Sequence, residues 1–251
     1  MRLPRMKPCA IIKAPMNSLI MADYSTQPTS FNRLIAPALF LASVVVFFGF
    51  SFTHGEAVDF WFQSFFWNGH AWLIPHDNVI GKIVAYDGPK ALLISFAIYL
   101  LVIILLPRFA PRWMNRRQAA YVFIAIALIS VTSTQLRTVT NMATPLELEN
   151  YGGKFPHLLL FDSKPSGYPC HGFPAGHASG GLALICLYWA WFNKPYRRLG
   201  LVIGLSLGGL MGLYQIARGE HMLSHTLATL GIAWFLSELL ALIIKPTQSN
   251  D

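Results

Sequence analysis

Charged side chains are scarce in this chain of 251 residues: Asp, Glu, Lys and Arg together make up 12%, whereas an average soluble domain has roughly 25%. Only 11 residues are acidic, and hydrophobic residues reach 54% with a mean hydropathy of +0.47. So little charge and so much apolar surface disfavour a soluble globular domain. The composition instead indicates a protein embedded in a lipid bilayer.

Cysteine is equally scarce, with three residues at Cys9, Cys170 and Cys186. We expect only one of them, Cys170, on the outer side of the membrane, so no intrachain disulfide is expected. Gly/Ser linkers and internal repeats are also missing. The chain is therefore expected to form one membrane domain over residues 33–245, between cytoplasmic tails at 1–32 and 246–251.

Six apolar runs are long enough, or nearly so, to cross a bilayer as helices. They are Leu34–Phe52, Ala91–Leu106, Ala119–Ser133, Ser179–Phe192, Leu199–Ala217 and Leu223–Ile244. The segment Ala57–Pro75 is rich in Phe and Trp but interrupted by polar residues, a pattern typical of a helix in the membrane interface. The sequence thus predicts an all-α, polytopic membrane bundle of about six helices, with an extracytoplasmic cap formed by the long loops Thr53–Lys90 and Thr134–Ala178.

Basic residues cluster on one side of this predicted bundle. Thirteen of the 19 lysines and arginines lie before the first run or in the segments after the second, fourth and sixth runs. The positive-inside rule makes that side cytoplasmic, and it leaves all eight histidines on the other side. We therefore expect a bacterial inner-membrane protein whose polar chemistry faces the periplasm. The basic residues are dispersed and form no nucleic-acid-binding motif, so no nucleic-acid partner is expected.

Two polar blocks, Phe173–Gly180 and Arg218–His225, each lie at the mouth of an apolar run. Ionisable side chains at a membrane boundary are costly unless they find a partner, a watery cavity or a ligand. In a helical conformation Arg218, His221 and His225 share one face. The other block reads Pro-Ala-Gly-His at the predicted start of a helix, where free backbone N–H groups favour an anion such as phosphate.

At these residues the chain resembles the type 2 phosphatidic acid phosphatase (PAP2) family, in particular its bacterial membrane branch. The family pattern is Lys-x6-Arg-Pro, then Pro-Ser-Gly-His, then Ser-Arg-x5-His-x3-Asp. Pro174-Ala175-Gly176-His177 matches the second stretch, Gly219–Leu227 matches the third, and Arg137-x6-Thr144-Pro145 looks like the first. The outer segment Tyr86–Lys90 also resembles some bacterial members.

Several positions depart from that pattern. Ala175 replaces the usual Ser, Thr144 replaces an Arg, and Gln215 replaces another Arg, with Arg218 one helical turn later. His225 stands where the family has Asp, and a neutral imidazole supplies a hydrogen bond but no negative charge.

The resemblance implies a metal-independent lipid phosphatase that works through a phosphohistidine and needs no cofactor. His221 would be the nucleophile, His225 would orient it, and His177 would act as general acid and base. The phosphate would be held by a set of side chains and backbone groups from the three stretches: Arg137, Thr144, Ala175, Gly176 and Arg218. The expected partners are a lipid phosphate or diphosphate and the surrounding membrane lipids, and the sequence carries no signal for an oligomeric state.

Three other functions fit the same residues. His221 and His225, four residues apart, could bind Zn²⁺ together with His177, or hold haem as an axial pair. Arg218 on the same face disfavours a metal, because a cation beside a metal ion is repelled. The departures from the family pattern also allow a degenerate lipid-phosphate binder without turnover, and phosphohistidine chemistry allows phosphotransfer to an acceptor other than water.

Overall fold

The computed structural model describes residues 32–169 and 171–247, and this part of the chain is helical without any named strand. Five helices are long and apolar enough to cross a membrane. They are α2 (Asn32–Gly49), α5 (Gly88–Leu105), α6 (Arg116–Thr140), α9 (Arg197–Ala217) and α10 (Leu223–Ile244). Helix α5 is continuous with α4 (Val79–Lys82) through the π-helical turn η2 (Ile83–Asp87). The expected all-α membrane bundle is confirmed. Most of the N-terminal tail, Cys170 and the last four residues lie outside the described part.

The fourth expected span differs from the prediction. Residues 176–190 form three consecutive short helices, α7 (Gly176–Ala183), η6 (Leu184–Cys186) and α8 (Leu187–Ala190). At 1.5 Å per residue these 15 residues extend about 22 Å, less than the roughly 30 Å of a hydrocarbon core. The segment is buried among α6, α9 and α10, so its apolar side chains contact protein.

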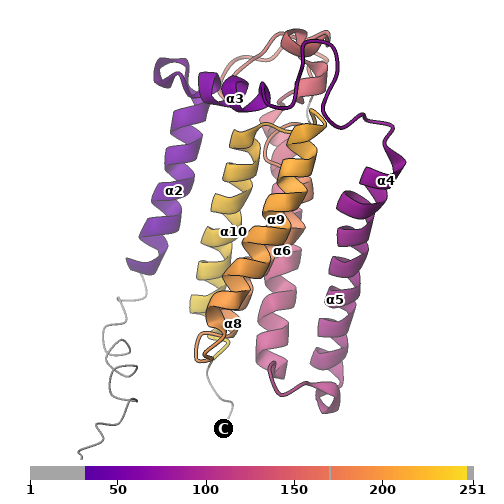
Figure 1. The fold of residues 1–251 in the computed structure, drawn as a ribbon. Helices are drawn as coiled ribbons and strands as arrows, with labels where there is room; N and C mark the ends of the chain where they lie inside the picture. Colours follow the sequence, from indigo (N-terminus) through magenta and orange to yellow (C-terminus); the bar gives the residue numbers. More distant parts are fainter. Residues whose placement is uncertain (1–31, 170, 248–251) are drawn as a thin grey trace, which may run out of the picture.

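Helix α3 (Gly55–Gln63) lies across one end of the bundle (Figure 1). The expected interfacial helix is therefore much shorter than Ala57–Pro75, because an irregular segment follows Gln63. Two of its polar residues are buried: Asp59 Oδ1 accepts from the Ser224 N–H at 2.8 Å, and Gln63 Nε2 donates to the Ile216 carbonyl at 2.9 Å. These bonds attach α3 to the ends of α9 and α10.

The long segment between α6 and α7 lies at this same end (Figure 1). It contains the short turns η4 (Pro145–Glu147) and η5 (Glu149–Tyr151), and its backbone joins the α9–α10 turn through the Leu146 N–H, which donates to the Gly219 carbonyl at 2.9 Å. The cap expected from the long loops is thus formed by α3 and this segment together. The opposite end carries the α5–α6 connection, which includes η3 (Pro107–Phe109), and the α8–α9 connection.

Candidate active site

The capped end of the bundle brings both polar blocks together. His177 is the second residue of α7, and His221 lies in the short turn between α9 and α10. Their ring centroids are 5.7 Å apart. Gly219 permits the turn with a positive φ of 76°, and a Cβ there would lie 2.4 Å from the Trp72 ring. Segments 44 residues apart in sequence therefore form one site.

The hydrogen bonding of His221 fixes which of its nitrogens is free. Its Nδ1 lies 2.8 Å from the Gly172 carbonyl, which only accepts, so Nδ1 carries the hydrogen. Its Nε2 therefore holds a lone pair, and this atom is buried without a hydrogen-bond partner in the described part of the chain. His221 is 1% exposed. A neutral, oriented imidazole with a free Nε2 is the form that a nucleophile requires.

Gly172, and not His225, is the hydrogen-bond acceptor that orients His221. The rings of His221 and His225 meet edge to face at 5.8 Å, and His225 Nδ1 accepts from the Met222 N–H at 3.3 Å. Gly172 is held in place because its own N–H donates to the Met142 carbonyl at 2.7 Å. A Cβ on Gly172 would lie 2.4 Å from the Ala143 carbonyl oxygen, so this close approach requires glycine. The expected hydrogen bond between His225 and His221 is therefore not formed, and the Gly172 carbonyl takes its place.

His177 contacts a residue that the sequence analysis did not assign to the site. Its Nε2 lies 3.1 Å from the Tyr86 hydroxyl, and its Nδ1 is buried without a partner among the described residues. Tyr86 belongs to the π-helical turn before α5. The only sequence signal for it was the resemblance of Tyr86–Lys90 to bacterial family members.

Three cationic side chains flank the two histidines. The Arg137 guanidinium packs on the start of α7, since a Cβ on Gly176 would lie 3.1 Å from Arg137 Nη1. Arg218 is 6% exposed, and its Nη2 donates to the His76 carbonyl at 3.1 Å. The Nε atoms of both arginines are buried without a partner among the described residues. Lys90, which the sequence analysis left outside the site, lines a cleft together with Arg137 and His177.

Two of the expected phosphate contacts find other partners. The Thr144 hydroxyl donates to Glu147 Oε2 at 2.9 Å, in the capping box of η4, and Thr144 lines neither of the clefts beside His177. The Ala175 N–H donates to the His225 carbonyl at 3.0 Å, and its side chain is fully buried. Thr144 and Ala175 therefore hold the local backbone, whereas Gly176 lines the cleft beside His177.

His177 and Tyr86 lie between two clefts. The inter-helix cleft, about 420 Å³, runs between α5, α6 and α7 and is lined by apolar residues such as Leu93, Ile94 and Ile126. The outer cleft, about 440 Å³, is lined by polar and charged residues that include Lys82, Arg218 and Glu220. Both clefts reach His177. The site thus meets an apolar space on one side and a polar space on the other.

The sequence profile of the PAP2 superfamily matches residues 118–248, which is more than half of the chain. The chain belongs to the PAP2 superfamily. It is also similar to a solved structure described as the first transmembrane PAP2 type phosphatidylglycerolphosphate phosphatase from Bacillus subtilis. The two share 15% identity with a TM-score of 0.55, over 87% of this chain and 99% of that one, which shows a common fold. No curated protein sequence matches the chain.

In this PAP2 protein the histidines do not form a metal-binding cluster. Within residues 32–169 and 171–247, no three His, Cys, Asp or Glu side chains are grouped so that they could hold a metal ion. Each of the three site histidines instead has a hydrogen-bond partner that is not a metal ligand set: a carbonyl for His221, a phenol for His177 and an amide N–H for His225. The alternative of a three-histidine metal centre therefore finds no donor set in this part of the chain.

Burial and positive neighbours keep the site histidines neutral. Burial lowers the pKa of His221 well below its usual value of 6.5, and the nearby His225 and His177 lower it further. Burial also lowers the pKa of His177 to about 4, with a further contribution from Arg137 and other cations. Both imidazoles are therefore neutral at neutral pH, and protonation of His177 requires added negative charge nearby.

The pH dependence of activity tests this neutral state of His221. A nucleophilic imidazole is lost when it is protonated, so the acid limb of kcat/KM marks its pKa in the free protein. Because that pKa is lowered, we expect the acid limb of kcat/KM to lie below pH 6.5. The measurement is the rate of phosphate release as a function of pH. The ionisation of the substrate phosphate, followed separately by phosphorus NMR, is used to correct this profile. An acid limb that stays near pH 6.5 after this correction would contradict the buried, neutral assignment.

Proposed function

We propose that this protein is a membrane lipid phosphatase that removes phosphate from a lipid phosphate or diphosphate through a phosphohistidine on Nε2 of His221. The observation that carries the proposal is the buried, unpartnered Nε2 of His221. It lies beside a second histidine and among cations that suit a phosphate. Membership of the PAP2 superfamily is consistent with this chemistry.

The first step transfers the phosphoryl group to the protein. Nε2 of His221 forms a bond to phosphorus, the bond from phosphorus to the leaving oxygen breaks, and His177 gives its proton to that oxygen. Arg137, Arg218 and Lys90 balance the negative charge on the transferring group, as cations do in phosphoryl transfer generally. The bound phosphate also favours the protonated form of His177, which the empty site disfavours.

The second step returns the protein to its starting state. His177, now neutral, takes a proton from water, the water oxygen bonds to phosphorus, and the bond from phosphorus to Nε2 breaks. Free phosphate leaves and His221 recovers its lone pair. The outer cleft, lined by polar residues and continuous with His177, is a suitable route for water and phosphate.

The inter-helix cleft supports a lipid as the substrate. Its apolar residues come from helices α5 and α6, whose outward faces carry many exposed hydrophobic side chains, and Arg137, Lys90 and His177 lie along it. A lipid tail in this cleft would place its phosphate next to those cations. A water-soluble phosphate would gain no binding free energy from the apolar wall of this cleft.

The distribution of charge supports a periplasmic site. Among the described residues, the basic clusters Arg108–Arg117 and Lys194–Arg198 lie in the α5–α6 and α8–α9 connections and the first residues of α6 and α9, at the end of the bundle away from His221. The positive-inside rule makes that end cytoplasmic. In this orientation the protein acts on lipids of the outer leaflet of a bacterial inner membrane.

The direct test uses purified, detergent-solubilised protein and four lipid classes: phosphatidylglycerol phosphate, phosphatidic acid, a polyprenyl diphosphate and a phosphorylated glycolipid. We expect phosphate release that resists EDTA and is inhibited by vanadate. Release that EDTA abolishes would favour metal catalysis, and binding without release would favour a degenerate binder. Either result would overturn the proposal.

The variant His177→Asn is expected to accumulate the phosphohistidine. Attack by His221 remains possible for a substrate with a good leaving group, but activation of water is lost, so hydrolysis of the intermediate falls by about a hundredfold or more. With a radiolabelled diphosphate substrate, acid-labile and alkali-stable label should remain on the variant protein. His70→Ala, which changes an exposed histidine of the α3–α4 loop, is the control and should hydrolyse normally. A His177→Asn protein that turns over at the normal rate without labelling would contradict the mechanism.

Phosphotransfer is a second candidate, favoured by the size of the outer cleft. About 440 Å³ lined by polar and charged residues exceeds what one water or one phosphate requires, so an acceptor headgroup has room beside His177. Adding candidate acceptor lipids to the assay would then yield a phosphorylated acceptor in place of free phosphate. Unchanged phosphate release in their presence would assign the protein to hydrolysis.

A further inference from the structure

A buried carboxylate lies next to the histidine turn. Asp59, on α3, is 4% exposed, and its Oδ1 accepts from the backbone N–H of Ser224 at 2.8 Å. Ser224 immediately precedes His225 and is three residues after His221. A carboxylate from one helix thus caps the first turn of another, at the point where the candidate catalytic residues lie.

Asp59 forms no ion pair with a cationic side chain of the described residues. The ion pairs among the described residues use other carboxylates, namely Glu238 with Arg33, Glu220 with His76, and Glu56 with His157. The partial positive charge at the start of α10 and the hydrogen bonds from Ser224 favour its ionised form. Burial raises the pKa of Asp59 to about 6, so Asp59 is mostly ionised at neutral pH. Buried carboxylates without a cation are costly, and they concentrate at functional sites.

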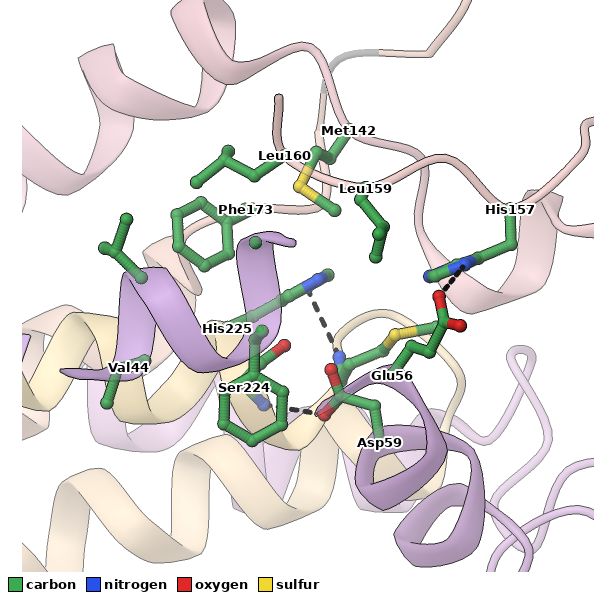
Figure 2. A pocket seen from close by; sticks show the side chains of 14 residues that line it. Val44, Glu56, Asp59, Met142, His157, Leu159, Leu160, Phe173, Ser224 and His225 are labelled. Carbon is green, nitrogen blue, oxygen red and sulfur yellow. Dashed lines mark hydrogen bonds and ion pairs between the residues drawn. The ribbon is translucent and has the colours of Figure 1, made fainter. Parts of the chain in front are cut away.

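Asp59 and His225 also line one small cavity, with room for about one water molecule (Figure 2). Ser224 and two further ionisable side chains line it, Glu56 and His157, whose Oε2 and Nδ1 are 3.9 Å apart. Apolar side chains, including Phe173, Leu159 and Met142, form the rest of the wall. His225 is 1% exposed, and its Nε2 has no hydrogen-bond partner in the described part of the chain.

These contacts matter because the family pattern has a carboxylate where this chain has His225. When the phosphoryl group bonds to Nε2 of His221, the ring becomes positive while Nδ1 keeps its hydrogen. The Gly172 carbonyl holds that hydrogen but carries no net charge. A negative charge in a buried, low-dielectric setting stabilises such a cation far more than the same charge in water.

We propose that Asp59 is a positioning residue that supplies, through Ser224 and His225, the negative charge that the nucleophile lacks at position 225. This inference rests on the proposed phosphohistidine mechanism. Asp59 touches neither the substrate nor His221; it accepts a hydrogen bond in the first turn of α10 and lines the same cavity as His225. The pair of Asp59 and His225 thus replaces the single family carboxylate.

The variant Asp59→Asn separates this role from simple capping. Its amide oxygen still accepts the Ser224 N–H, so a purely structural residue would tolerate the change with normal kcat. If the charge is needed, kcat falls about tenfold or more, which corresponds to a loss of roughly 1.4 kcal/mol in the transition state, while KM stays within about twofold. Glu56→Gln is the matched control, because Glu56 lies one turn earlier on α3 and lines the same cavity. Its kcat should be unchanged.

A rescue experiment identifies charge as the cause. Adding His225→Asp to Asp59→Asn places a carboxylate at the family position and should restore much of the lost kcat.

Three results would overturn the inference: a normal kcat in Asp59→Asn, an equal loss of kcat in Glu56→Gln, or a double variant whose kcat stays at the level of Asp59→Asn. If the unmodified protein releases no phosphate from any lipid class, the proposed function fails and this inference fails with it. If the unmodified protein is active and Asp59→Asn is normal, only this inference fails.

Discussion

Replacing His221 by alanine is expected to reduce phosphate release by at least about ten-thousandfold, the scale on which enzymes lose activity without their nucleophile. The reason is specific to one atom. Nε2 is the only nitrogen of His221 with a lone pair, since Nδ1 carries the hydrogen bonded to Gly172. No other described histidine combines that free nitrogen with a position facing His177 at 5.7 Å. The measurement is the initial rate of phosphate release, with radiolabel on the protein as a second readout.

Loss of activity must be separated from loss of folding, because His221 is fully enclosed. His221→Asn is the informative companion, since its amide N–H₂ retains a donor for the Gly172 carbonyl while removing the nucleophile. We expect this variant to elute as the unmodified protein does on gel filtration and yet to be inactive and unlabelled. Full activity in either His221 variant would refute the phosphohistidine mechanism.

The sequence predicted which polar residues gather in space better than it predicted their contacts. Arg137, His177 and His221 gather as expected, because each stands at the end of an apolar run on the same side of the membrane. The acceptor for His221 could not be predicted, because it is a backbone carbonyl and any residue has one. Asp59 was visible only as a polar interruption of an aromatic segment, and hydropathy does not tell whether such a residue faces water or a helix end.

Membrane spans were predicted well where helices face lipid and less well where they are enclosed. The runs that became α2 and α5, in which few residues are buried inside the protein, are continuous helices. The run Ser179–Phe192 is also apolar but is interrupted at η6 and surrounded by other helices. Apolar side chains suit lipid and protein interior equally, so composition does not separate the two environments.

A stripe of glycines on α9 explains how the short, buried segment is held. Gly200, Gly204 and Gly208 recur every four residues and therefore share one helix face. A Cβ on these residues would lie 2.5 Å, 2.4 Å and 2.4 Å from the backbone nitrogens of Tyr188, Ile185 and Leu182, respectively. Small residues allow membrane helices to approach this closely. The same contact fixes α7, and α7 carries His177.

Replacing Gly208 by leucine is therefore expected to prevent correct folding. The new side chain would collide with the backbone of α7, which cannot move aside as a flexible side chain can. The loss of folding stability is therefore larger than that of ordinary overpacking, which is about 1–3 kcal/mol. Gly209→Leu is the matched control: it makes the same change one residue later, where a Cβ meets nothing within 4 Å. That variant should fold and gain slightly from better helix propensity, by about 1 kcal/mol at most. Detergent-solubilised yield, gel filtration and thermal melting measure both. Equal stability of the two variants would mean that α7 and α9 do not pack through this stripe, and His177 would then lose the support that places it opposite His221.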